Sequence, residues 1–104
     1  MLALLLTARA KAAPLGGTAN EARLMFERAM SELAAGRFAD ARDDFRRSLG
    51  LHPSRATAFN LAVALRGTGE TRAALAVLDE LLAGRYGVLD PERRSEADAL
   101  RAEM

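Results

Sequence analysis

The sequence is similar to itself when it is shifted by 33 residues, and this internal repeat constrains the fold more than any other feature. The identical pairs are Phe26 and Phe59, Ala29 and Ala62, Gly36 and Gly69, Ala41 and Ala74, and Leu49 and Leu82. Phe45 also aligns with Leu78, and Met30 aligns with Val63, so these positions keep an apolar residue. Repeats of this length are single supersecondary units that bury their apolar faces against their neighbours. We therefore expect a stack of similar units.

Apolar residues in the first copy recur at the spacing of two successive α helices. The stripe between residues 20 and 35 is Met25, Phe26, Ala29, Met30 and Leu33. The stripe of the following segment is Phe38, Ala41, Phe45 and Leu49. Gly36 lies between the two segments, where a helix C terminus often adopts the left-handed conformation, and Pro53 ends the second helix. The first copy is therefore predicted to be a helical hairpin.

The second copy repeats the pattern of the first. Helices are expected at about residues 58–66 and 73–83, because apolar residues again recur at helical spacing there. The glycines at residues 67–69 predict a turn between these helices, and Gly84 ends the second one. The chain therefore contains two hairpins in tandem.

A fifth helix is predicted at about residues 91–104. Asp90 provides an N-cap carboxylate, Pro91 suits the first turn, and the helix dipole favours the acidic Glu92. The apolar stripe of this helix is thin and consists of Ala97, Leu100 and Met104.

The first copy resembles a tetratricopeptide repeat. The residues that carry this resemblance are Ala29, Gly36, Phe38, Ala41, Phe45, Leu49, Leu51 and Pro53. In the second copy, residues 60–62 (Asn-Leu-Ala) are similar to the Asn-Leu-Gly of the family. The chain departs from the family pattern at Arg28 and Glu32, where apolar or aromatic residues are usual, and at Thr71, where an aromatic residue is usual.

The resemblance implies an all-α fold. Two antiparallel helix-turn-helix repeats, at about residues 22–53 and 55–84, would stack as a short right-handed α-solenoid, and the C-terminal helix would follow them. Half of the chain is hydrophobic but only 5% is aromatic, which fits thin helical layers. The domain is expected to span residues 19–104.

Residues 1–18 are expected to lie outside this domain. A short apolar run followed by Ala-x-Ala resembles the end of a secretory signal peptide, with cleavage after Ala10 or Ala12, although no basic residue precedes the run. A frayed helical tail is the alternative interpretation. Residues 14–18 contain proline and two glycines and are predicted to be a linker. The similarity of the N-terminal segment to a signal peptide favours a periplasmic or otherwise extracytoplasmic location in a bacterium. A cytoplasmic location is the alternative.

The composition argues against several classes of function. Fifteen Lys and Arg residues balance fourteen Asp and Glu residues, and the net charge of +1 gives no reason to expect a nucleic-acid partner. The apolar N-terminal run is too short to cross a bilayer. The chain has no cysteine and one histidine, His52, so we expect no metal site, and no phosphate-binding motif indicates a cofactor.

The acidic residues do not indicate a catalytic pair. Glu21, Glu27 and Glu32 lie on one predicted helix, and Asp43 and Asp44 lie on the next. Because they alternate with arginines, we interpret them as parts of exposed faces and not of a cleft that could support acid–base chemistry. We therefore expect a protein without catalytic residues.

The resemblance implies that the first helices of successive repeats line a concave groove. The residues expected there are Phe26, Met30, Leu33, Phe59, Asn60, Val63 and Arg66. The apolar members fit the core equally well, and Asn60 fits either a ligand-binding amide or a side chain bonded to nearby backbone. The predicted function is a protein-interaction module that binds a peptide or a partner helix in this groove, with a scaffold or assembly role. The alternative is a structural spacer or self-association element that binds copies of itself.

Overall fold

The computed structural model describes residues 2–104, with side chains from Gly17 onward, and all the regular secondary structure in this range is helical. The five helices are α1 (Leu2–Ala34), α2 (Phe38–Leu51), α3 (Arg55–Gly67), α4 (Thr71–Leu82) and α5 (Pro91–Ala102). The predicted all-α fold is therefore confirmed. The end of α3 differs from the prediction, because this helix continues through Gly67, which the sequence places in a turn.

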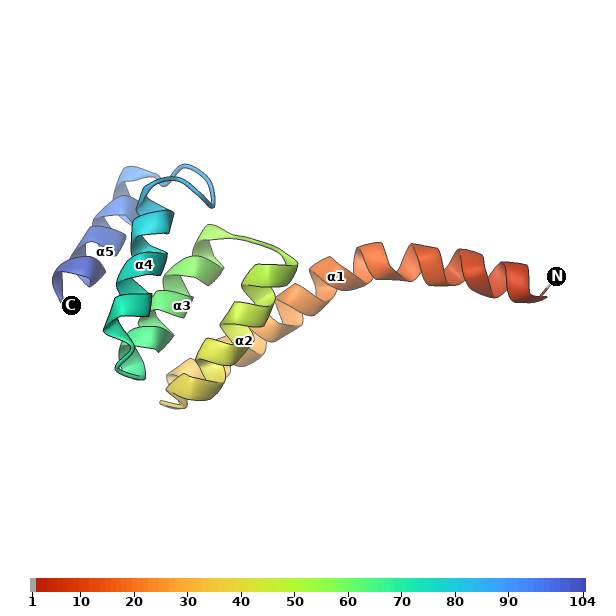
Figure 1. Ribbon diagram of the computed structural model, residues 1–104, viewed down its shortest axis with the longest axis horizontal. Helices are drawn as coiled ribbons and strands as arrows, with labels where there is room; N and C mark the ends of the chain where they lie inside the picture. The colour runs from red at the N-terminus through yellow and green to blue at the C-terminus, as the bar shows by residue number, and fades with distance from the viewer. Residues whose placement is uncertain (1) are drawn as a thin grey trace.

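The helices form two stacked hairpins and a terminal helix (Figure 1). α1 pairs with α2 and α3 pairs with α4, while α2 packs on α3 and joins the two hairpins. α5 packs on α4, and α1 approaches α3. The N-terminal part of α1 extends away from the other four helices, so the molecule is 60 Å long but only 29 Å by 20 Å across. The predicted tandem of hairpins is thus confirmed.

The two hairpins turn in the same way because each turn contains a left-handed glycine. Gly36 has φ of +76° and Gly69, which lies 33 residues later, has φ of +81°. In both turns the residue after the glycine donates its N–H to a helix carbonyl, Arg37 to Glu32 at 2.8 Å and Glu70 to Leu65 at 2.9 Å. This bonding satisfies carbonyls that a helix end would otherwise leave unpaired.

The core consists of two adjoining clusters that are rich in alanine. The first cluster is Ala29, Ala41, Phe45, Leu61, Ala64, Leu65 and Ala74. The second is Ala58, Ala62, Leu78, Leu81, Ala97 and Leu100. Leu49, Val77 and Met104 pack against both clusters and make them continuous. Small side chains let the helices approach closely, so few large residues are needed to fill the space between them.

The N-terminal helix is longer than the sequence pattern predicts. It begins at Leu2 and includes residues 14–18, where a linker is expected. The side chains of the segment that resembles a signal peptide lie outside the described residues. The domain boundary near Ala19 stays a prediction. Within residues 2–104, no helix is both long and apolar enough to span a bilayer.

Two carboxylates that were expected on exposed faces are buried between α1 and α2. Glu32 and Asp44 are only 8% and 7% exposed, whereas Glu27 and Asp43 are exposed as predicted. Arg28 compensates Asp44 with two hydrogen bonds of 2.7 Å from its Nε and Nη2 atoms. A carboxylate can be buried when an arginine donates two parallel hydrogen bonds to it. The alternation of charges along the sequence does not reveal such pairing.

Candidate functional site

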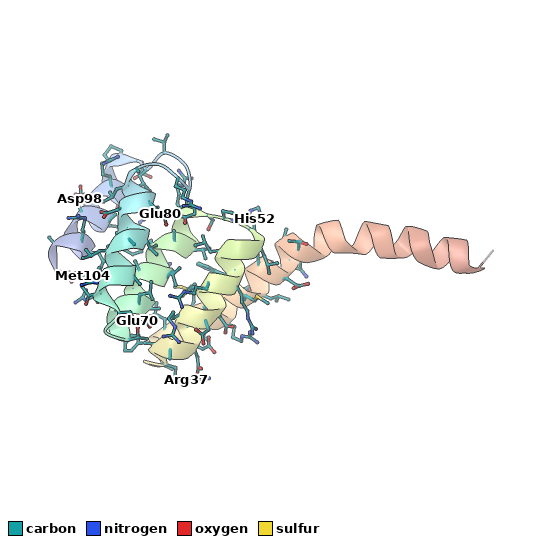
Figure 2. The ribbon with its side chains drawn as sticks, in the orientation of Figure 1. Arg37, His52, Glu70, Glu80, Asp98 and Met104 are labelled. Carbon is teal, nitrogen blue, oxygen red and sulfur yellow. The ribbon has the colours of Figure 1, made fainter. Side chains whose placement is uncertain are left out.

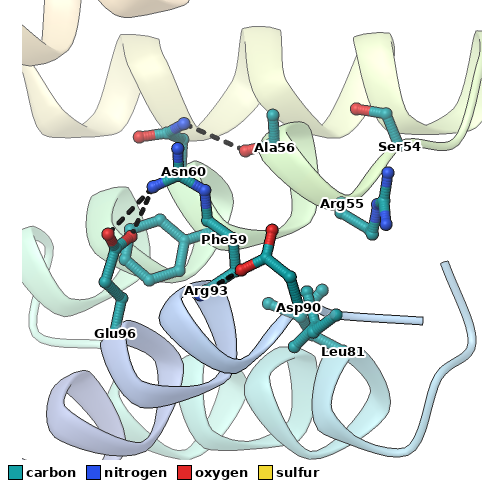
Figure 3. Close-up of a pocket in the computed structure, with 10 residues that line it drawn as sticks. Ser54, Arg55, Ala56, Phe59, Asn60, Leu81, Asp90, Arg93 and Glu96 are labelled. Carbon is teal, nitrogen blue, oxygen red and sulfur yellow. Dashed lines mark hydrogen bonds and ion pairs between the residues drawn. The ribbon is translucent and has the colours of Figure 1, made fainter. Parts of the chain in front are cut away.

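Two hollows adjoin at the first turn of α3, on the side of the molecule formed by α1, α3 and α5. The smaller has about 330 Å³ and is lined by Ala19, Ala22, Arg23, Phe26, Ser48, His52, Ser54, Ala56 and Thr57. The larger has about 550 Å³ and is lined by Ser54, Arg55, Ala56, Phe59, Asn60, Leu81, Leu89, Asp90, Arg93 and Glu96 (Figure 3). Ser54 and Ala56 line both hollows, so the two lie side by side, and together we call them the α1–α3–α5 groove.

Capping side chains fix the two helix starts that open onto the larger hollow. Ser54 caps α3 by accepting a 3.1 Å hydrogen bond from the backbone N–H of Thr57. Asp90 caps α5 by accepting a 2.8 Å hydrogen bond from the backbone N–H of Arg93. These bonds satisfy N–H groups that the helix itself leaves unpaired, so they set where each helix begins.

The charged groups of the larger hollow already have hydrogen-bond partners. Arg93 donates to both oxygens of Glu96 at 2.9 and 3.0 Å, and Arg55 donates to the backbone oxygen of Val88. Figure 3 shows Arg93 and Glu96 beside the ring of Phe59. The surface of the hollow is therefore part apolar and carries no excess of one charge, which suits a neutral segment better than a strongly charged ligand.

Asn60 makes the backbone bond that was one of the two roles left open by the sequence, and it also borders the larger hollow. Its side-chain nitrogen donates a 2.9 Å hydrogen bond to the backbone oxygen of Ala56, one turn earlier in α3. It also lines the larger hollow and is only half-buried. The bond uses one N–H of the amide, which leaves the second N–H and the carbonyl oxygen without another partner among the described residues.

Comparison with known families identifies the fold. The model of the tetratricopeptide repeat matches the chain twice, over residues 2–56 and 26–91. The chain belongs to the tetratricopeptide-repeat family. The two matches together cover both hairpins, and repeats of this family generally mediate protein–protein interactions. No curated protein and no solved structure matches the chain.

In this tetratricopeptide-repeat chain, three of the seven predicted groove residues line the groove. Phe26 lies in the smaller hollow, where its ring also meets that of Phe45 edge-on, with centroids 5.7 Å apart and planes at 65°. Phe59 and Asn60 lie in the larger hollow. Both phenylalanines are half-buried and pack against the core, so they serve the fold and the groove together.

The other four predicted residues line neither of these two hollows. Leu33 and Val63 are half-buried and pack against the first and second core clusters, respectively. Met30 remains 38% exposed. Arg66 forms a 2.5 Å ion pair with Glu103 just beyond α5, and both side chains are exposed.

The contribution of α5 was missed by sequence reasoning. Arg93 and Glu96 stand three residues apart on α5, so they lie on one face of the helix, and that face closes the larger hollow. The helix start at Asp90 and this spacing were visible in the sequence. What the sequence did not reveal is that α5 lies beside α3, because its thin apolar stripe does not specify a neighbour.

No cluster of three or more histidine, aspartate and glutamate side chains suited to a metal ion occurs in the described part of the chain. His52 is exposed at the end of α2, and its backbone N–H donates to the oxygen of Ser48 at 2.9 Å. Figure 2 places His52 and Glu80 towards one end of the hairpins and Arg37 towards the other. His52 therefore contributes to the rim of the smaller hollow only.

Proposed function

We propose that the chain is a protein-interaction module that holds an extended peptide in the α1–α3–α5 groove and performs no catalysis of its own. The single observation that carries this proposal is that the two hollows adjoin at Ser54 and Ala56. Two adjoining hollows accommodate several successive residues of a partner, whereas an isolated pocket would suit a small molecule.

The chemistry of the groove supports a peptide partner. Phe26 and Phe59 offer apolar contacts on two successive first helices, and aromatic anchors of this kind dominate binding energy at interfaces. Asn60 offers both a donor and an acceptor in the same hollow as Phe59, which matches the alternating N–H and C=O groups of an extended backbone. The charged residues of the larger hollow are paired, so the peptide does not have to supply a particular charge.

Titration of short peptides against the protein tests the proposal. Asn60→Ala and Arg93→Gln alter the larger hollow without removing a residue of the core clusters. For a peptide that binds the wild-type protein, we expect each variant to raise the Kd about tenfold, which corresponds to about 1.4 kcal/mol. Arg72→Gln is the matched control, because Arg72 is exposed on α4 and lines neither hollow of the groove.

Light scattering over a concentration series completes the test, because self-association is the competing role. A monomer whose peptide binding is weakened by both groove variants and not by the control supports the proposal. A dimer that binds no peptide of the panel contradicts it and favours the spacer or self-association role. Equal binding by all three variants also contradicts it, since the groove would then be unused.

A further inference from the structure

A third hollow lies away from the groove, between the end of α2 and the loop that follows α4. It has about 440 Å³ and is lined by Arg46, Leu49, Gly50, Pro53, Arg85 and Tyr86. None of these residues lines the α1–α3–α5 groove, and none belongs to α1, α3 or α5. We call this hollow the α2–α4 slot. It is a second surface, distinct from the one that carries the proposed function.

The walls of the α2–α4 slot are apolar and stiff. Leu49 packs against both core clusters, and the ring of Tyr86 packs against the second, so neither moves without disturbing the core. Pro53 has a fixed φ and follows directly on the end of α2. A Cβ built at Gly50 would meet no atom within 4 Å, so the missing side chain leaves the slot open. An aliphatic side chain of a partner would be desolvated here at little conformational cost.

The charged groups that line the slot are both cationic. Arg46 is half-exposed, and its nearest carboxylate, that of Glu70, is 4.0 Å away. Arg85 is paired with Glu80, and its guanidinium carbon also lies 5.8 Å from the centre of the Tyr86 ring. The charge of Arg46 is therefore only weakly compensated. A carboxylate of a partner would pair with this exposed guanidinium beside the apolar slot.

We propose that the α2–α4 slot binds an acidic segment of a protein partner. An aliphatic side chain of the segment enters between Leu49, Pro53 and Tyr86, and the carboxylates that flank it pair with Arg46 and Arg85. Charge complementarity favours this occupant, because the lining residues include two arginines and no acidic residue. Glu80 beside the slot pairs with Arg85, which leaves Arg46 as the weakly compensated cation. A nucleic acid is disfavoured, since two arginines would neutralise too few phosphates and the slot has an apolar wall.

The chain carries its own reporter for this binding. Tyr86 is the only tyrosine and there is no tryptophan, so all tyrosine fluorescence of the chain comes from the slot. The probe is a blocked peptide with one leucine between two pairs of glutamates, and its matched control has glutamines in place of the glutamates. We expect the glutamate peptide to change the Tyr86 emission in a saturable way. The glutamine peptide should bind at least about tenfold more weakly.

Two pairs of variants make the test specific. Arg46→Gln should weaken the glutamate peptide at least about fivefold, as should Gly50→Leu, which fills the slot. Arg47→Gln removes the same charge from the next residue, which does not line the slot, and should leave affinity within about twofold. Any of three results would overturn the proposal: both peptides bind equally, Arg46→Gln and Arg47→Gln lose affinity equally, or an oligonucleotide binds more tightly through Arg46. Asn60→Ala should leave this binding intact, which separates the slot from the groove.

Discussion

The aromatic ring of Phe38, at the start of α2, lies against Gly67, the last residue of α3. A Cβ built at Gly67 would overlap the ring atoms nearest the Phe38 backbone, which cannot swing away as freely as the tip of a long side chain. The two residues belong to different repeats, so this contact helps to set how closely the second hairpin stacks on the first. Gly67 is therefore needed for close approach, and not for a turn as its sequence context predicts.

Gly67→Ala is expected to lower the free energy of unfolding by about 1–3 kcal/mol, because the added methyl group displaces the Phe38 ring. Gly50→Ala is the matched control. It also adds a methyl group to a helix, but it meets no atom within 4 Å and should stabilise by about 0.5–1 kcal/mol. Urea denaturation followed by circular dichroism measures both changes. In a Phe38→Ala background the cost of Gly67→Ala should vanish, and a cost that persists there would assign the effect to something other than this contact.

The buried carboxylates between α1 and α2 make stability depend on pH in two opposite ways. Burial raises the pKa of Glu32, and the adjacent Asp44 raises it further. Hydrogen bonds from Arg28 hold the pKa of Asp44 below its ordinary value. Asp44 therefore stabilises the fold above pH of about 3.9 and loses this effect as the pH falls through its folded pKa. Glu32 favours the fold below pH of about 4.3, and this contribution is lost as the pH rises through its raised pKa.

Glu32→Gln should accordingly raise the melting temperature more at pH 7 than at low pH, because burial disfavours the charged carboxylate and its Oε1 atom has no hydrogen-bond partner. The gain should shrink at about pH 4 and below, because the wild-type Glu32 is then protonated. Glu27→Gln on the same helix is the control, since Glu27 is exposed and should change the melting temperature little at either pH. A gain of equal size at pH 4 and pH 7 would show that the charge on Glu32 is not the cause.

The terminal helix is held by few apolar contacts, so it should detach before the hairpins unfold. Leu100 is 7% exposed and is the largest side chain that α5 buries in the second core cluster. Leu100→Ala should cost about 2–5 kcal/mol, and the exposed ion pairs of α5 contribute too little to compensate for that loss. Hydrogen exchange should then show that amides of α5 lose protection while those of α3 keep it. Asp98→Ala, on the exposed face of α5, should leave both protected, and a matching loss in α3 would indicate that the domain unfolds as one unit.

The repeat and its turns were predictable from the sequence, because both depend on local patterns. Apolar residues at helical spacing identified the hairpins, and glycines at positions 36 and 69 identified the turns, since left-handed backbone favours glycine. The similarity at an offset of 33 residues showed that the second hairpin repeats the first. None of these inferences required knowledge of which helix lies beside which.

The interior polar groups and part of the groove were not predictable, because they depend on contacts between helices. The departures from the family pattern at Arg28 and Glu32 were visible, but the sequence could not show that Asp44 faces them across the interface. The same limit applies to Arg66, whose partner Glu103 lies 37 residues away. Residues on one face of a helix can be found by spacing, whereas their partners on another helix require the packing to be known.

Ser48 illustrates the same point and leads to a direct test. The sequence does not predict its burial, because it is a polar residue beside the apolar stripe of α2. In the structure it is 2% exposed, and its Oγ donates a 2.7 Å hydrogen bond to the backbone oxygen of Ala22 on α1. Ser48→Ala should therefore destabilise by about 0.5–1.5 kcal/mol, even though alanine has the higher helix propensity. Ser95→Ala, on the exposed face of α5, should be neutral or slightly stabilising. Chemical denaturation of the two variants measures the difference, and a Ser48→Ala protein as stable as Ser95→Ala would mean that this buried bond contributes nothing to the pairing of α1 and α2.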